Sequence, residues 1–249
     1  MMIKATLIDH MGSDLTTVNA ARVSFGKKSE PIRWDWYEYE DGSASGDYIA
    51  VLDDRDVKLI KYLAKHKHLS PFGHAFASFH VKAPIFVARQ LVKHQYLRWN
   101  EISRRYVDDD PEVYVPEVWR GRSADKKQGS DGVVGLDFFN GDGGRFEGYF
   151  GEGTLAEVEA ENRDSLLDLY CGLIKAGVAP EQARMVLPQS TMTEWYWSGS
   201  LDAFAAMCKL RCASDTQYES RIVADQISKV MSDLYPVSWG ALMKGKDDD

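Results

Sequence analysis

The residues best suited to chemistry are cations concentrated between positions 81 and 106. This segment holds six Lys or Arg residues and a single acid, in a chain whose formal net charge is -8. On one continuous helix, Arg89 and Lys93 would share a face, and Ser103 and Arg105 would follow where the helix passes into a loop. Cations, a hydroxyl and backbone N–H groups that converge in this way form a site for a phosphate or an oxyanion. A solvated basic face that pairs with acids elsewhere is the alternative.

Another arginine stands in an apolar stretch, Ala183-Arg184-Met185. A guanidinium group is costly to bury there unless an anion accompanies it. Glu181, Asp202 or a bound ligand could be that anion. An internal salt bridge explains Arg184 as well as a ligand does.

Other kinds of catalytic site find less support in the sequence. Five of the six histidines lie between His66 and His94, but no HxxxH or HExxH spacing occurs, so we expect no metal site. No GxSxG motif is present, which disfavours a serine hydrolase. Cys208 and Cys212 are four residues apart among apolar neighbours, so we interpret them as core thiols rather than nucleophiles.

Hydrophobic periodicity predicts the elements that would position these residues. Loose alternation predicts strands over 2–9 and 75–81. Helical spacing predicts a helix capped by Asp14, a helix after Asp53 and Asp54, a helix from Pro84 to about Trp99, a helix from Thr154 to Gly177, a turn opened by Pro180, a helix capped by Ser200, and a last helix over about 215–234 with Pro236 beyond it.

Two stretches show neither the alternation of a strand nor the spacing of a helix. Residues 26–52 mix aromatic side chains with Gly, Ser and acids, and we interpret them as an insertion or long loop with room for a hairpin. Residues 107–153 are irregular, and their Gly-rich part follows no clear strand, which favours a surface loop over a phosphate cradle. Because no linker divides the chain, the sequence predicts one α+β domain over residues 1–249, with a mostly helical second half.

Composition excludes several classes of protein. The chain has 249 residues, of which 44% are hydrophobic and 27% charged, as in globular proteins. Its acidic balance disfavours a protein that coats a nucleic-acid polymer. No apolar run approaches the roughly 20 residues of a membrane span, and residues 1–12 lack the apolar core of a signal peptide. Three cysteines without a CxxC motif indicate a reducing compartment, so we expect a cytoplasmic protein.

Seven short blocks spread along the chain share the pattern of one family. They are Ala20–Phe25, His68–His74, His80–Gln90, Asn100–Tyr106, Ala179–Pro188, Leu210–Arg211 and Gln217–Glu219. In this order they resemble the flavin-dependent thymidylate synthases, also called thymidylate synthase complementing proteins. The two irregular stretches, 26–52 and 107–153, then look like expansions of the family's domain.

The chain departs from the family signature, which is Arg-His-Arg, then seven residues, then Ser. Here the triplet is Lys93-His94-Gln95, with Ser103 at the expected distance. Lys93 keeps a charge without the guanidinium fork, and Gln95 has no charge. Further departures, where family members often have Asn, Arg, Asn and His, are Ser200, Asp202, Ala206 and Asp215. An acid near a flavin phosphate is unfavourable, so weaker flavin binding, or contacts from the expanded segments, is expected.

The resemblance implies a fold, an assembly and an activity. Members of the family are homotetramers whose active sites are shared between subunits, and the fold expected here is α+β with a central, mostly antiparallel sheet and flanking helices. They bind FAD, take a hydride from NADPH and move a methylene group from methylenetetrahydrofolate to carbon 5 of dUMP, giving dTMP. They use no cysteine nucleophile. The expected partners are therefore these small molecules and further copies of the chain, with no nucleic-acid polymer and no membrane.

The resemblance also assigns roles to individual residues. Arg211 is the expected catalytic residue, because it would stabilise negative charge that develops on the uracil ring. His68 is a looser candidate for the folate side. Residues expected to bind dUMP are Gln90, Lys93, Glu101, Ser103, Arg104, Arg105, Arg184 and Arg211. Residues expected to bind FAD are Ser24, Ser70, His94, Gln95, Tyr96, Glu101, Ser200 and Leu210.

Two other functions remain open at this point. The departures at Gln95, Ser200 and Asp202 would fit a related enzyme that modifies carbon 5 of a pyrimidine nucleotide, for example by hydroxymethylation or on a cytosine nucleotide. The triplet Lys93-His94-Gln95 would also fit a nucleotide-binding homologue that has lost catalysis. Product masses from dUMP and dCMP, and flavin reoxidation, would separate the three.

Overall fold

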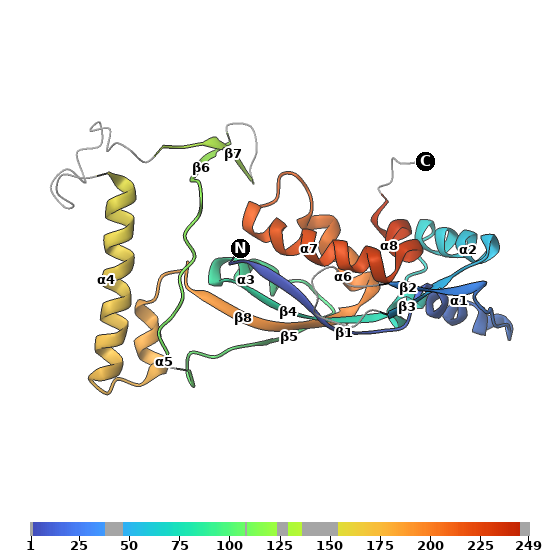
Figure 1. The fold of residues 1–249 in the computed structure, drawn as a ribbon, viewed down its shortest axis with the longest axis horizontal. Coiled ribbons are helices and arrows are strands. Elements are labelled where there is room, and N and C mark those ends of the chain that lie inside the picture. Colours follow the sequence, from blue (N-terminus) through green and yellow to red (C-terminus); the bar gives the residue numbers. More distant parts are fainter. Residues whose placement is uncertain (1, 38–46, 108, 124–128, 136–153, 245–249) are drawn as a thin grey trace. The chain divides into compact units, whose positions relative to one another are not determined.

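The computed structural model describes residues 2–37, 47–107, 109–123, 129–135 and 154–244, which form two compact units (Figure 1). Unit 1 comprises Met1–Lys82, Arg89–Glu101 and Glu194–Asp249. Unit 2 comprises Ala83–Ala88 and Ile102–Thr193. The chain therefore leaves unit 1 twice and returns to it twice, and two of these four crossings, at 88/89 and 101/102, lie within two residues of Gln90, Glu101 and Ser103, which are expected in the site.

Unit 1 is built on a four-stranded, mostly antiparallel sheet with the order β1-β4-β8-β5. The strands are β1 (Lys4–Met11), β4 (Phe76–Pro84), β5 (Leu97–Glu101) and β8 (Met192–Ser200). Ala5 pairs with Val81, and Trp99 with Trp197. Side chains along β4 alternate between buried and half-buried, as expected for a sheet that packs on one face only. This confirms the α+β class and both predicted strands.

Helices cover one face of this sheet and form the core of unit 1. They include α2 (Asp54–Lys65), α6 (Leu201–Arg211), α7 (Tyr218–Leu234) and α8 (Pro236–Met243), of which α6, α7 and α8 lie together over the strands in Figure 1. Phe79 of β4 and Trp197 of β8 both meet the ring of Phe204 edge-on, at centroid distances of 5.3 and 5.7 Å. All three side chains are buried, so α6 is fixed firmly to the middle of the sheet.

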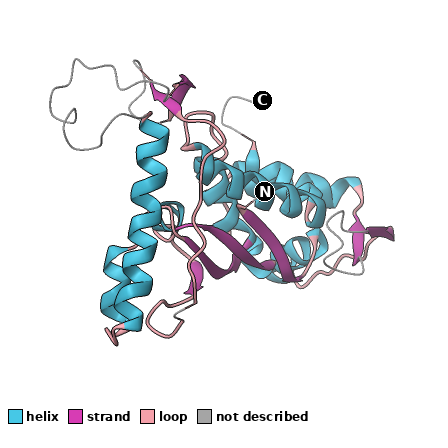
Figure 2. Cartoon of the chain, turned by 60° about the vertical axis from the view of Figure 1, so that its left-hand side comes forward, coloured by secondary structure: helices cyan, strands magenta, loops and turns pink. Residues whose placement is uncertain are grey.

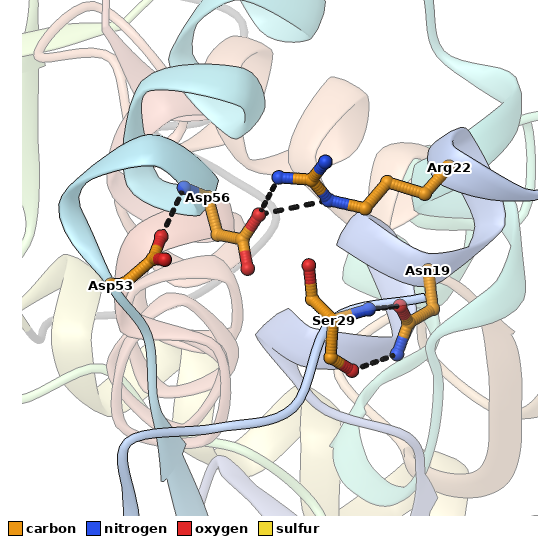
Figure 3. A network of polar contacts seen from close by, with 5 residues as sticks. All are labelled: Asn19, Arg22, Ser29, Asp53 and Asp56. Atoms are coloured by element: carbon orange, nitrogen blue, oxygen red, sulfur yellow. Dashed lines mark hydrogen bonds and ion pairs between the residues drawn. The ribbon is translucent and has the colours of Figure 1, made fainter. Parts of the chain in front are cut away.

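A polar network joins α1 (Asp14–Arg22) to the start of α2 (Figure 3). Asp53, which the sequence placed just before this helix, is the N-cap of α2, and its side chain accepts a hydrogen bond of 2.8 Å from the backbone N–H of Asp56. The Asp56 carboxylate is buried, and Arg22 donates to it through Nε at 3.0 Å and through a second nitrogen. The charge of Asp56 is thereby neutralised where the two helices meet.

Asp14 joins the first helix of unit 1 to the last. Its buried carboxylate accepts 2.8 Å hydrogen bonds from the backbone N–H groups of Val237 and Ser238, in the first turn of α8. Burial raises the pKa of Asp14, and the hydrogen bonds act against that shift. The prediction that Asp14 caps α1 was wrong: Ser13 is the N-cap, and Asp14 is the first helical residue.

The segment 26–52 holds a pair of antiparallel strands, β2 (Arg33–Tyr37) and β3 (Asp47–Val51), in agreement with the predicted hairpin. Residues 38–46 of the predicted insertion lie outside the described residues. Tyr37 donates a hydrogen bond of 2.6 Å to Asp233 of α7, which ties the strand pair to the helical layer. Trp36 and Tyr48 meet edge-on at 5.0 Å on its outer face.

Unit 2 is dominated by one long helix, α4 (Leu155–Lys175), which stands out in Figure 2. Thr154 and Glu157 form a capping box at its start, and Gly177, with φ of 84°, follows its end, both at the predicted places. The other elements of the unit are α5 (Pro180–Ala183), the 3-10 helix η3 (Arg184–Val186), and the paired strands β6 (Arg120–Arg122) and β7 (Ser130–Val133). Residues 108, 124–128 and 136–153 of the predicted irregular stretch are not among the described residues.

The predicted helix from Pro84 to about Trp99 was wrong in its second half. Pro84 ends β4, α3 covers only Ile85–Leu91, and Trp99 lies in β5. The apolar spacing of a helix ends near residue 92. From Leu97 onward the burial follows the two-residue period of a strand instead.

The C-terminal part also differs from expectation. The last predicted helix begins at Tyr218 rather than near 215, and Pro236 opens the additional helix α8 instead of following the final one. Strand β8 was not predicted, although buried Trp195 and Trp197 flank exposed Tyr196 with the period of a strand. Among the described residues, no helix combines the length and apolar character needed to cross a bilayer.

Candidate active site

The centre of the candidate site is the tight turn 92–96 between α3 and β5. The backbone N–H of His94 donates 3.1 Å to the carbonyl of Leu91, which closes the end of the helix. Tyr96 has φ of 63°, in a region that costs a non-glycine residue about 1–2 kcal/mol, and its side chain is 84% exposed. Lys93 is exposed in this turn and not on α3, so the predicted helical face shared by Arg89 and Lys93 does not exist.

His94 and Arg211 meet although they are far apart in the sequence. Arg211 is the last residue of α6, and its Nε donates a hydrogen bond of 3.0 Å to Nε2 of His94. A ring nitrogen that accepts carries no proton, so the imidazole is neutral with its proton on Nδ1. Burial, and then the positive charge of Arg211, lower the pKa of His94 to about 4.

The guanidinium of Arg211 is partly buried, and among the described residues it has no counter-ion. Burial lowers its pKa, and within the described part of the chain no carboxylate forms an ion pair with it. Within the described residues, its hydrogen-bond partner is the neutral ring of His94. A cation withdrawn from water without an anion attracts one, so Arg211 is suited to bind or stabilise negative charge on a ligand.

A chain of amide contacts sets the orientation of Gln90. Its Nε2 lies 3.3 Å from Oε1 of Gln217, whose own Nε2 lies 3.4 Å from the carboxylate of Glu219. Because an ionised carboxylate only accepts, Glu219 fixes the direction of the whole chain. The Oε1 atom of Gln90 is left buried without a hydrogen-bond partner among the described residues.

The other candidate residues of unit 1 either contact close sequence neighbours or are exposed. Glu101 accepts a hydrogen bond of 3.0 Å from Trp99 at the end of β5. Ser200 is the N-cap of α6, but its hydroxyl donates 2.6 Å to Asp202. The other four residues predicted to contact flavin, Ser24, Ser70, Gln95 and Leu210, and the looser candidate His68 are exposed. No hydrogen bond between described residues links Ser24 or Ser70 to the pair of His94 and Arg211.

Unit 2 holds the four candidates that follow β5 or lie in η3. Arg104 donates 2.7 Å bonds to the backbone oxygen and the carboxylate of Asp109. Arg105 donates 3.2 Å through Nε to the hydroxyl of Ser103, and its guanidinium lies 5.1 Å from the ring centroid of Tyr106. Ser103 and Arg105 are therefore brought together, as predicted, and Arg105 has no carboxylate partner among the described residues.

Arg184 is not the buried arginine that its apolar neighbours suggested. It is exposed, and its Nε donates 3.3 Å to the backbone oxygen of Glu181. Of the two alternatives for Arg184, the internal salt bridge to a carboxylate does not form within the described residues. Ala183, the last residue of α5, is buried, whereas Arg184 and Met185 in the 3-10 helix η3 are exposed.

Two residues of this region had no predicted role. Gln217 and Glu219 were part of the last matching block, but nothing in the sequence placed them beside Gln90, 127 residues away from Gln217.

Cys208 is buried, and burial raises the pKa of its thiol, which agrees with the prediction of a core thiol. Among the described residues, no group of three or more His, Cys, Asp or Glu is arranged to hold a metal ion.

Comparison with known proteins identifies the class to which this fold and site belong. A solved structure of the UMP/dUMP methylase PolB from Streptomyces cacaoi, bound with 5-Br dUMP, superposes with a TM-score of 0.68 at 28% identity, over 96% of this chain and 93% of that one. The same methylase bound with 5-Br UMP superposes with a TM-score of 0.67. The fold is thus shared with a nucleotide methylase.

The sequence comparisons are more specific. The family described as thymidylate synthase complementing protein matches residues 6–237. A flavin-dependent thymidylate synthase of Thermus thermophilus is 36% identical over 94% of this chain and 73% of its own length. One from Kosmotoga olearia is 36% identical over 95% and 88%, respectively. The chain belongs to the thymidylate synthase complementing protein family.

Proposed function

We propose that the protein is a flavin-dependent thymidylate synthase, which methylates carbon 5 of dUMP to give dTMP. Methylenetetrahydrofolate would be the carbon donor and NADPH the reductant. The observation that carries the proposal is Arg211, a partly buried cation without a counter-ion among the described residues, hydrogen-bonded to His94 in a chain of this family. An uncompensated guanidinium is what a reaction needs when negative charge develops on a planar ring.

The residues around the turn 92–96 fit a flavin. The exposed ring of Tyr96 is held in a costly backbone conformation, and Leu210 adds an exposed apolar side chain. The neutral ring of His94 and the hydroxyls of Ser24 and Ser70 could meet the polar edge of the same ring system, and Gln95 and Ser200 are further candidates. When bound, FAD would supply the hydride chemistry that no side chain offers.

The chain's own residues would bind and orient the nucleotide. Lys93, Arg105 and Arg184 are exposed cations without a carboxylate partner among the described residues, which suits them to a phosphate group. Arg104 already contacts Asp109, so its expected contribution is smaller. Gln90 and Ser103 would add hydrogen bonds from neutral side chains, and Glu101 would accept hydrogen bonds from the nucleotide. Arg211 would stabilise charge on the uracil ring.

The test is direct. Purified protein with added FAD should show flavin absorbance, consume NADPH, and convert dUMP and methylenetetrahydrofolate into a product with the mass of dTMP. A protein that takes up no FAD and forms no dTMP would refute the proposal. A product one oxygen atom heavier than dTMP would instead indicate hydroxymethylation.

A second candidate substrate follows from the solved structures. The methylase PolB was solved with both 5-Br dUMP and 5-Br UMP, so this fold accommodates a ribonucleotide as well as a deoxyribonucleotide. UMP is therefore the first alternative substrate to assay beside dUMP. A kcat/KM for UMP above that for dUMP would change the assignment to a UMP methylase.

The proposed assembly is a homotetramer with active sites shared between subunits, in a cytoplasmic protein. The family supports the assembly. The exposed apolar side chains Val23, Phe25 and Met185, each more than 70% exposed in the single chain, are consistent with it. All three cysteines are free thiols, as expected in the cytoplasm. Native mass spectrometry would give the subunit number, and a stable monomer with full activity would refute the shared site.

A further inference from the structure

We infer that His94 is a positioning residue for Arg211, in addition to any contact it makes with a flavin. The inference rests on the proposed function, because it concerns how Arg211 meets the nucleotide. Its basis is the 3.0 Å hydrogen bond from Nε of Arg211 to Nε2 of His94. The two residues lie 117 positions apart, so the contact depends on tertiary structure and not on local sequence.

The contact decides which atoms of Arg211 remain available. A guanidinium group offers five N–H donors: one on Nε and two on each of the terminal nitrogens. His94 occupies the donor on Nε, so a ligand can be met only through Nη1 and Nη2. Arg211 therefore presents its end, and not its side, to the nucleotide. One N–H of Nη1 lies beside one N–H of Nη2, so both can be donated to a single carbonyl oxygen on which negative charge develops.

The support of His94 is itself rigid. The backbone N–H of His94 is bonded to the carbonyl of Leu91, and its ring lies 6.5 Å from the buried ring of Trp197 in β8. At the other end of the contact, α6 is held by Phe204 against the same strand. A long arginine side chain loses much rotamer freedom when it is ordered. The hydrogen bond at Nε restricts these rotamers before the ligand binds, so binding itself loses less side-chain entropy.

The experiment is a double-mutant cycle that measures binding rather than turnover. His94→Leu removes the acceptor, and Arg211→Met removes the donor. Dissociation constants of dUMP and of FAD are measured separately for the wild type, the two single variants and the double variant. His66→Asn is the matched control, since His66 is an exposed histidine that lies against Tyr62 and has no place in the proposed site.

The expected result has three parts. His94→Leu should weaken dUMP binding about tenfold in the wild-type background and less than twofold when Arg211 is already Met, as expected for coupled residues. His94→Gln, whose amide oxygen reaches the position of Nε2, should restore dUMP affinity to within about threefold. His66→Asn should change neither dissociation constant.

Two results would overturn the inference. One is an equal loss of dUMP affinity on His94→Leu with and without Arg211. The other is a loss confined to FAD, which would leave His94 as a flavin contact alone. If His94→Leu does not fold, His94→Asn replaces it, because its acceptor falls short of Arg211 without leaving an apolar gap. A wild type that binds no dUMP would refute the proposed function, a result distinct from either of these.

Discussion

The two units hold their candidate residues in different ways. In unit 1, Arg211 contacts His94 across 117 positions of sequence, and Gln90 contacts Gln217 across 127. In unit 2, the contact of Arg104 spans five positions, that of Arg105 two, and that of Arg184 three. The first group is fixed by the folded core and the second by short turns. We therefore expect substitutions in unit 1 to reveal coupling between distant residues, and those in unit 2 to act one at a time.

The largest effect should come from Arg211→Ala. Loss of one group that stabilises transition-state charge typically lowers the rate by about 10²–10³-fold, or roughly 3–4 kcal/mol. The free energy of unfolding should change little, because the guanidinium has no carboxylate partner among the described residues. Steady-state kinetics and urea unfolding check the two statements. Arg211→Lys should recover little of the rate, and full activity in either variant would remove Arg211 from the mechanism.

Arg22→Met tests the strength of tertiary anchoring in unit 1. It leaves the buried carboxylate of Asp56 without its partner, which typically costs about 3 kcal/mol or more. Urea unfolding followed by tryptophan fluorescence gives the value. The control is Arg104→Met in unit 2, whose partner Asp109 is exposed, so the loss should stay near 1 kcal/mol or below. Equal losses would contradict the comparison.

Substitution of the exposed arginines of unit 2 should weaken dUMP binding and leave the free energy of unfolding nearly unchanged. Arg105→Gln and Arg184→Gln each remove one charged contact to a phosphate, which we expect to raise the KM for dUMP about tenfold, since such bonds contribute roughly 1.5–3 kcal/mol. Unfolding free energies should change by less than about 0.5 kcal/mol. If the two arginines act independently, the double variant should show the product of the single effects. A strongly non-additive result would show that the two arginines are energetically coupled, as we expect of the distant residues in unit 1.

The smallest effect should be a pH dependence of stability caused by His94. Its folded pKa of about 4 lies below the ordinary 6.5, so the unfolded chain binds more protons between these values. Its contribution is complete above pH 6.5 and is lost as the pH falls toward 4. His94 is half-exposed, which keeps the effect small. Between about pH 7.5 and about pH 5, the free energy of unfolding should therefore fall more for the wild type than for His94→Gln, as urea unfolding at the two pH values would show. An unchanged difference would contradict it.

The sequence predicted elements whose signals are local. Helices α2 and α4 begin at Asp54 and Leu155, each within one residue of the predicted start, and β1 and β4 lie where alternation placed them. It missed the turn at Tyr96, because a positive φ at a tyrosine is imposed by the surrounding structure and leaves no mark on composition. Strand β5, which follows that turn, was therefore not predicted either.

The candidate site was predictable residue by residue but not as an arrangement. His94 and Arg211 were both named from the family pattern, yet their contact depends on how α6 packs against β8, which no spacing in the sequence encodes. Arg184 shows the reverse error. Its apolar neighbours suggested burial, but a 3-10 turn has its own periodicity and leaves the guanidinium outside.

The bond from Asp14 to the start of α8 has a consequence for how the protein is made. Its partner Val237 lies 223 positions downstream, and a ribosome that adds about 5–20 residues per second needs roughly 10–45 s to reach it. During that time the carboxylate at the start of α1 lacks the two N–H groups that satisfy it. Unit 1 therefore cannot be completed from its N-terminal side as it emerges. A chaperone that holds the early strands during synthesis should raise the yield of folded protein more than one that acts after release.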